Sequence, residues 1–114
     1  MTSRLPNADS AIVDLAKITE YLLNDAHPQG SAKSRFLKLF GFKLDRPDEL
    51  ERALLAHARA HPISRIRSSL FGPKFEVSGP MAAPDGRLLH VRTVWIIRLG
   101  DANPAFVTLK PLRR

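Results

Sequence analysis

Four side chains in this sequence are of types that can cleave a phosphodiester bond without a metal ion. They are His27, Lys33, Thr93 and Thr108. Histidine has an unperturbed pKa of about 6.5, so His27 can give or take a proton near neutral pH. Lys33 is expected in the first turn of a helix, where free backbone N–H groups favour an anion. Together these groups predict cleavage of RNA, in which one group accepts the proton of a 2′-hydroxyl and another protonates the leaving 5′-oxygen.

A second set of side chains could bind the RNA that the first set would cleave. Lysine and arginine stabilise charge on the non-bridging phosphate oxygens, and an indole ring can stack on an exposed base. We therefore expect the substrate to be bound by Arg92, Trp95, Arg35, Lys74 and Lys110. Both sets also have a purely structural alternative, with a loop histidine, a solvated helix face, ordinary strand threonines and a tryptophan in the core. The residue pattern leaves these alternatives open.

The composition favours an anionic partner and excludes several kinds of site. Lysine and arginine total 18 against 11 aspartate and glutamate, so the net charge of +7 attracts phosphate, anionic lipid or an acidic protein. The chain has no cysteine, which excludes disulfides, thiolate metal sites and a cysteine nucleophile. His57 and His61 have the i, i+4 spacing of metal ligands, but no third ligand is evident nearby. We therefore expect neither a metal site nor a cofactor.

Three helices must position the first candidate residues. The first helix follows an N-cap at Asp14 and carries an apolar stripe as far as about Leu23. The second helix has Ser31 as its N-cap and ends before Gly41. Its inward side chains are Phe36, Leu37, Leu39 and Phe40. The third helix follows Asp45, and acidic residues in its first turn favour the positive end of the helix dipole.

The second half of the chain predicts an antiparallel sheet. The stretch from Arg87 to Leu99 is the longest run rich in β-branched and aromatic residues, and it fits a central strand. Alternation predicts a neighbouring strand over 74–78, joined to the central strand by the turn Pro84-Asp85-Gly86. A last strand covers 105–110, and a short strand near 64–71 would be a fourth. Helices followed by a meander of three to four antiparallel strands form an α+β fold.

The length of the chain and its apolar runs predict the domain organisation. A chain of 114 residues fits one domain, and we expect residues 1–10 to be a tail and 11–114 to be the domain. No apolar run reaches the roughly 18 residues that would span a bilayer, and the N-terminus lacks the apolar region of a secretory signal. The sequence predicts a cytoplasmic protein, although a domain cut from an exported protein would look the same.

The two faces of the predicted sheet can be assigned in two ways, because residues opposite one another on paired strands share a face. In the favoured arrangement the helices cover an apolar set: Phe75, Val77, Val94, Ile96, Val107 and Leu109. The exposed face then carries a basic, hydroxyl-bearing set around one aromatic ring: Lys74, Glu76, Thr93, Trp95, Thr108 and Lys110. The other arrangement buries Thr93 and Trp95. We favour the first because it keeps Thr108 and Lys110 out of the core.

Two segments, ITEYLLNDAHPQGSAKSRFLKLFGF and APDGRLLHVRTVWIIRLGDANPAFVTLKPL, resemble a family of small bacterial domains with HPxGxxK and VRTVW motifs. Members occur alone and at the C-termini of large secreted polymorphic toxins. The order of elements is also similar to the barnase–EndoU–colicin–RelE class of ribonuclease toxins. In colicin-type tRNA nucleases of that class, the active site contains a hydroxyl residue two positions before a tryptophan, with a histidine and a lysine from the helical part. The matching residues here are Thr93, Trp95, His27 and Lys33.

The resemblance implies a metal-independent endoribonuclease toxin of a toxin–antitoxin or contact-dependent inhibition system, with tRNA as one candidate substrate. It also implies an acidic immunity or antitoxin protein as the partner. The site of action would be the cytoplasm, with delivery as the C-terminal domain of a secreted effector as one route. The alternative is a non-catalytic basic module that binds nucleic acid or protein. An immunity protein is disfavoured because the partners of nucleases tend to be acidic and this chain is basic.

Overall fold

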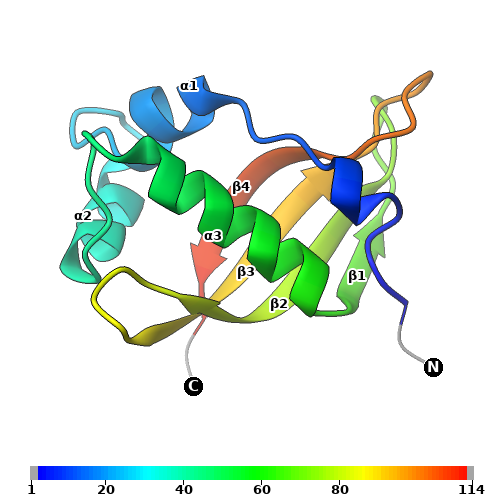
Figure 1. The fold of residues 1–114 in the computed structure, drawn as a ribbon. Helices are drawn as coiled ribbons and strands as arrows, with labels where there is room; N and C mark the ends of the chain where they lie inside the picture. The colour runs from blue at the N-terminus through cyan, green and yellow to red at the C-terminus, as the bar shows by residue number, and fades with distance from the viewer. Residues whose placement is uncertain (1–2, 113–114) are drawn as a thin grey trace.

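The computed structural model describes residues 3–112 as helices followed by a four-stranded sheet (Figure 1). The elements in chain order are η1 (Ala8–Ser10), α1 (Leu15–Lys17), the π-helical turn η2 (Ile18–Leu22), α2 (Ser31–Leu39), α3 (Pro47–Ala60), β1 (Ile63–Arg67), β2 (Lys74–Ala82), β3 (Leu88–Ile96) and β4 (Ala105–Pro111). This order confirms the predicted α+β fold. Among the described residues, no helix combines the length and the apolar character needed to cross a membrane.

The sheet is an antiparallel meander in the order β1-β2-β3-β4. Figure 1 shows α3 lying across one face of the sheet, over β2 and β3, with α1 and α2 toward the β4 side. Over the part of the chain that the structure describes, the opposite face carries no helix. We call these the covered face and the outer face. Each predicted catalytic or binding residue of the sheet therefore lies in one of three places: the core, the outer face or the free edge of β4.

The apolar core lies between the helices and the covered face of the sheet. Its largest fully buried side chains are Trp95, Phe42, Ile18, Leu22, Leu23, Leu37, Leu50, Leu54, Met81, Leu109, Val77 and Val91. Burial of apolar surface is worth roughly 25 cal/mol per Å2, so this cluster is the main source of stability. Leu39 was predicted to face inward but is 73% exposed. It lies two residues after Leu37, which places it on the opposite side of α2.

The ends of the helices follow local signals in the sequence. The Asp14 carboxylate accepts a hydrogen bond from the N–H of Ala16 at 3.0 Å, as an N-cap does. Gly41 follows α2 with a φ of 100°, a left-handed conformation that suits glycine. The N-cap of α2 is Gly30 and not the predicted Ser31, because the carbonyl of Gly30 already accepts the first helical hydrogen bond, from the N–H of Ser34.

The favoured assignment of the sheet faces is wrong, and the other arrangement is the one observed. Phe75 of β2 pairs with Trp95 of β3, and Val77 pairs with Thr93. All four side chains are buried, and both Thr93 and Trp95 are 0% exposed. Val94, which lies between them, points to the outer face. Of the residues predicted to form the exposed face, Thr93 and Trp95 are therefore part of the core.

A β-bulge in β4 changes which residues of that strand reach the core. Thr108 pairs with Val94 of β3. The next residue along β3 pairs with Phe106, so Val107 is the extra residue of the bulge. Phe106 and Leu109 consequently both reach the core, although they are three residues apart. A period of two had instead grouped Val107 with Leu109.

Thr93 is tolerated in the core because its hydroxyl is fully hydrogen-bonded. Its Oγ1 accepts from the indole N–H of Trp95 at 2.9 Å. The Nε2 of His57 lies 3.0 Å from the carbonyl of Gly79, which can only accept, so Nε2 carries the proton. The Nδ1 of His57 then accepts from the Thr93 hydroxyl at 3.0 Å. Burial lowers the pKa of His57 to about 4, so this ring is neutral at pH 7.

The N-terminal segment that was predicted as a tail packs on the domain. Leu5 is buried, and the carbonyl of Ser3 accepts a hydrogen bond from the N–H of Ile63 at 2.7 Å. Ile12 makes a parallel bridge with Ala105 at the free edge of β4. The outermost parts of the predicted boundaries, residues 1–2 and 113–114, lie outside the described residues.

Candidate active site

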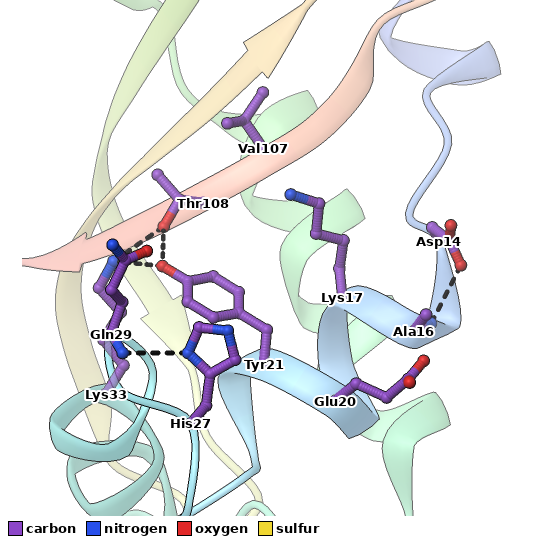
Figure 2. A pocket seen from close by; sticks show the side chains of 10 residues that line it. All are labelled: Asp14, Ala16, Lys17, Glu20, Tyr21, His27, Gln29, Lys33, Val107 and Thr108. Carbon is purple, nitrogen blue, oxygen red and sulfur yellow. Dashed lines mark hydrogen bonds between the residues drawn. The ribbon is translucent and has the colours of Figure 1, made fainter.

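A cleft of about 570 Å3 opens at the free edge of the sheet, between β4, the α1–η2 helix and the start of α2 (Figure 2). Its lining residues are Asp14, Ala16, Lys17, Glu20, Tyr21, His27, Gln29, Lys33, Val107 and Thr108. Figure 2 shows the side chains of Tyr21, Lys33 and Thr108 meeting at one wall. The cleft thus combines two nearby segments of the helical half with a strand from the other end of the chain.

Local packing brings two of these side chains, Tyr21 and Lys33, to the wall. Tyr21 lies in η2, whose buried residues Ile18 and Leu22 anchor the turn in the core. Lys33 lies in the first turn of α2, as predicted. The loop between these elements packs tightly, because a Cβ at Gly30 would collide with the carbonyl oxygen of Tyr21. A glycine at this position therefore allows the tyrosine and the lysine to approach one another.

The side chains of Tyr21, Lys33 and Thr108 form a closed triangle of hydrogen bonds (Figure 2). Lys33 Nζ donates to the Tyr21 phenol oxygen at 2.7 Å and to Thr108 Oγ1 at 2.9 Å. The two oxygens are themselves 2.8 Å apart, and either hydroxyl can be the donor. Thr108 can also donate to the carbonyl of Leu109 at 3.4 Å. One ammonium group and two hydroxyl groups are therefore held at a single point of the cleft.

The ammonium group of Lys33 dominates the electrostatics of this wall. Among residues 3–112, no ion pair joins Lys33 to a carboxylate. The ammonium nitrogens of Lys33 and Lys17 lie 5.2 and 5.9 Å from the centre of the Tyr21 ring. Partial burial opposes ionisation of Tyr21, but the hydrogen bonds from Lys33 and Thr108 and the charges of both lysines outweigh it. The pKa of the phenol is therefore lowered from 10.0.

The His27 ring adds a directed hydrogen-bond donor. Its Nδ1 accepts from the backbone N–H groups of Gln29 and Gly30, each at 3.0 Å. An atom that accepts two N–H groups carries no proton, so the neutral ring holds its proton on Nε2. The ring also contacts Tyr21 edge to face, with centres 5.0 Å apart. His27 can thus offer its Nε2–H to a ligand in the cleft.

The cleft brings together three of the four predicted catalytic residues, His27, Lys33 and Thr108. The fourth, Thr93, lies inside the core and is hydrogen-bonded there. Trp95 is equally buried, so its ring has no face free for the predicted stacking on a base. The expected exposed position of both residues is wrong, because β3 pairs with β2 so that Trp95 lies opposite Phe75 and Thr93 opposite Val77, on the covered face.

The other predicted binding residues do not line the cleft: Arg35, Lys74, Arg92 and Lys110. Arg35 is exposed on α2. Arg92 and Lys110 are direct partners on the outer face of the sheet. Arg92 and Arg67 flank the buried carboxylate of Glu76, with Nε–O distances of 3.5 and 3.4 Å. We call the set of Arg67, Lys74, Arg92 and Lys110 the outer basic face.

His57 and His61 bond through their ring nitrogens to the backbone of β2. In the described part of the chain, no group of three or more histidine, cysteine, aspartate or glutamate side chains could hold a metal ion. The two rings lie 4.9 Å apart, and the Nε2 atom of each bonds to a backbone carbonyl, of Gly79 and Pro80 respectively. Their i, i+4 spacing therefore serves the attachment of α3 to β2.

Comparison with known proteins identifies the family of this chain. The family described as Domain of unknown function (DUF6883) matches residues 4–113. The chain belongs to this family. No curated protein matches it. Among solved structures it is similar to a chain of a contact-dependent growth inhibition toxin–immunity protein complex from Klebsiella pneumoniae 342, with a TM-score of 0.70 and 12% identity, over 94% of this chain and 97% of that chain. At this identity the similarity shows that the DUF6883 domain shares its fold with that chain.

Tyr21 is the residue of this DUF6883 domain that the sequence analysis did not select. It lies beside the apolar residues of the first helix, and its hydroxyl lies in the cleft. Two signals in the sequence could have identified it. Tyr21 is the only tyrosine in the chain, and it belongs to the same resembling segment as His27 and Lys33.

Proposed function

We propose that this domain is a metal-independent endoribonuclease toxin whose active site is the cleft of Tyr21, His27, Lys33 and Thr108. The observation that carries the proposal is the convergence of His27, Lys33 and Thr108, from a loop, a helix and a strand, on one open cleft. A lysine held by two neutral hydroxyls keeps its charge for an anionic ligand. The phosphate of RNA is an anion that this arrangement would suit.

In the proposed reaction the scissile phosphate lies against Lys33. The 2′-oxygen attacks phosphorus and the 5′-oxygen leaves, and the products are a 2′,3′-cyclic phosphate and a 5′-hydroxyl. Lys33 stabilises the charge that develops on the non-bridging oxygens. His27 donates from Nε2 to the same phosphate as a neutral imidazole, because two backbone N–H groups hold its Nδ1 unprotonated.

The outer basic face would bind RNA on either side of the cleaved bond. Lys110 lies two residues after Thr108 on β4, so the two share a face of the strand. Arg92 lies beside Lys110 and extends the positive surface across the sheet. Such contacts with phosphates are independent of base sequence and weaken with added salt. The proposal therefore keeps Lys74, Arg92 and Lys110 as binding residues and assigns Trp95 to the core.

The toxin role rests on the shared fold together with the charge of the chain. The similar chain comes from a complex of a toxin with its immunity protein, and an inhibitor of a nuclease is expected to be acidic. The net charge of +7 therefore favours the toxin side of such a pair. We accordingly infer an acidic immunity or antitoxin partner and delivery as the C-terminal domain of a secreted effector. The target would be cytoplasmic RNA, with tRNA as the first candidate.

Incubation of the purified domain with total tRNA in the presence of a metal chelator tests the enzymatic proposal. We expect cleavage that leaves 2′,3′-cyclic phosphate ends, is lost in Lys33→Met and is kept in Lys43→Met. Lys43 is exposed and lies outside the cleft, so its variant controls for the loss of one charge. Intact tRNA at every concentration of the wild-type domain would refute the nuclease. Cleavage only after addition of a divalent metal would refute metal independence.

The outer basic face favours a second candidate, a non-catalytic module that binds nucleic acid or an acidic protein. Production of the domain inside cells separates the two candidates. A nuclease toxin would arrest growth, and Lys33→Met would relieve the arrest. A binding module would be tolerated, and its affinity for RNA would depend on the outer face more than on the cleft.

A further inference from the structure

We propose that the phenol of Tyr21 is the general acid of this cleft and gives its proton to the leaving 5′-oxygen. The inference rests on the proposed function, because it assigns a role in the same reaction. The side chain lines the cleft, and its oxygen is the corner of the triangle that both Lys33 and Thr108 contact.

The hydrogen bonds around Tyr21 suit a phenol that loses its proton. While Tyr21 is protonated, it can donate to Thr108 Oγ1 at 2.8 Å, and the Thr108 hydroxyl can donate to the carbonyl of Leu109. After proton transfer, the Thr108 hydroxyl can turn to the phenolate. The phenolate oxygen then accepts from this hydroxyl and from Lys33 Nζ at 2.7 Å, and the second of these donors is charged. The site thus stabilises the product of proton transfer with groups already in place.

The charges around the Tyr21 ring favour the phenolate. The titratable groups that the cleft places around the phenol are Lys17, Lys33, His27, Asp14 and Glu20. Both lysines have their ammonium groups within 6 Å of the ring centre, at 5.9 and 5.2 Å. The Asp14 carboxylate is bound to the backbone as an N-cap, and Glu20 is exposed. The charges of Lys17 and Lys33 therefore stabilise the phenolate.

The neighbouring groups are less suited to this task. A histidine acts as an acid from its cationic form, and His27 can reach that form only if Nδ1 gives up the N–H groups of Gln29 and Gly30. Lys33 would no longer carry the positive charge that stabilises the phosphate if it gave up a proton. The alcohol of Thr108 is a far weaker acid than a phenol. Tyr21 is the remaining member of the triangle that can lose a proton.

The proton and electron changes of the step balance as follows for one turnover. The 2′-oxygen forms its bond to phosphorus, and its proton passes to water. The bond between phosphorus and the 5′-oxygen breaks, and its electron pair goes to that oxygen. The phenol proton of Tyr21 moves to the same oxygen, which leaves as an alcohol. The phenolate regains a proton from water before the next turnover.

Substitution of Tyr21→Phe with two substrates tests the acid role. One substrate is the dinucleotide UpA, whose leaving alcohol needs a proton, and the other is uridine 3′-(4-nitrophenyl phosphate), whose leaving group does not. For UpA we expect kcat/KM to fall at least about 100-fold, as for loss of a general acid, with little change for the nitrophenyl ester. Lys33→Met should slow both substrates. Equal losses on both substrates in Tyr21→Phe, or an unchanged rate on UpA, would overturn the acid role.

A titration that needs no activity provides the second readout. Because Tyr21 is the only tyrosine, the near-ultraviolet absorbance of tyrosinate reports its ionisation directly. We expect a midpoint below 10.0 in the wild-type domain and a higher midpoint in both Lys33→Met and Thr108→Val. A wild-type midpoint at or above that value would overturn the inference. A wild-type domain that cleaves neither substrate would refute the proposed function itself, whereas a cleaving wild type with a fully active Tyr21→Phe would refute the acid role alone.

Discussion

The ammonium nitrogen of Lys33 lies 2.9 Å from the hydroxyl oxygen of Thr108, although 75 positions separate the two residues. Lys33 belongs to the first turn of α2, and Thr108 belongs to the edge strand β4. The contact therefore exists only when the helical half of the chain is packed against the sheet. The candidate active site and the tertiary structure depend on each other, so activity measurements on variants need a stability measurement beside them.

Removal of the Thr108 hydroxyl should lower the rate of tRNA cleavage without unfolding the domain. Thr108→Val keeps the shape of the side chain but removes a partner of both Lys33 and Tyr21. We expect a loss of about 1 kcal/mol in the free energy of unfolding, the usual net value of one hydrogen bond. Cleavage of tRNA should fall by about tenfold or more, since a charge-assisted contact that positions Lys33 is lost. Urea denaturation and the rate of tRNA cleavage measure the two effects.

Thr19→Val is a matched control for that experiment. The Thr19 hydroxyl donates to the carbonyl of Leu15 within the same helix and does not line the cleft. Its variant should change stability by a similar amount and leave cleavage unchanged. Equal rates for Thr108→Val and the wild-type domain would contradict a role for the triangle.

Removal of charge from the outer basic face should weaken RNA binding in a salt-dependent way. Lys110→Gln deletes one exposed cation beside Arg92. The logarithm of affinity for a 2′-O-methyl RNA should depend less steeply on the logarithm of salt concentration, by about one unit of slope per lost phosphate contact. Lys43→Gln, which removes an exposed charge far along the chain from this face, should leave the slope unchanged. Identical slopes for the wild type and Lys110→Gln would remove this surface from the binding site.

The buried ring of His57 should make the domain sensitive to acid. Its pKa is lowered to about 4 in the folded protein from 6.5, mainly by burial. Between these values the unfolded chain binds a proton that the folded chain does not. Its contribution to stability is therefore complete above pH 6.5, is lost as the pH falls to about 4, and changes no further below that. The loss amounts to about 3 kcal/mol at most, at 1.36 kcal/mol per pKa unit.

Urea denaturation at several values of pH measures that effect. His57→Gln should flatten the dependence of the free energy of unfolding on pH in this interval. His90→Gln, on a half-exposed position of β3, should leave the slope in place. A stability that is constant between pH 6.5 and 4 in the wild-type domain would show that His57 is not buried in its neutral form.

Trp95→Phe separates a core role for the indole from a role in RNA binding. The change leaves a small cavity and removes the N–H that donates to Thr93. We expect the free energy of unfolding to fall by about 2 kcal/mol, from the cavity and the lost hydrogen bond together. The affinity of the folded fraction for RNA should be unchanged, because the ring is 0% exposed. A large loss of affinity at unchanged stability would contradict the buried position.

Local signals were enough to predict the order of the elements. The N-cap at Asp14, the left-handed Gly41 and the turn Pro84-Asp85-Gly86 each act within a few residues, so they are readable from the sequence. The same holds for the choice of His27 and Lys33, because a histidine in the loop before a helix and a lysine in its first turn are neighbours along the chain. The sequence by itself therefore determined the α+β class and the place of His27 and Lys33 beside one another.

Only the tertiary structure decided which face of β3 meets the helices. Alternation defines two faces but not which one is covered, and the extra residue Val107 shifts the phase of β4. Thr93 and Trp95, which were predicted to be functional residues, are buried because the register of β3 with β2 places them opposite Val77 and Phe75. The packing of η2 against the sheet edge likewise places the Tyr21 phenol beside Thr108. A hydrogen bond between such distant positions depends on the three-dimensional path of the chain, and no local pattern records it.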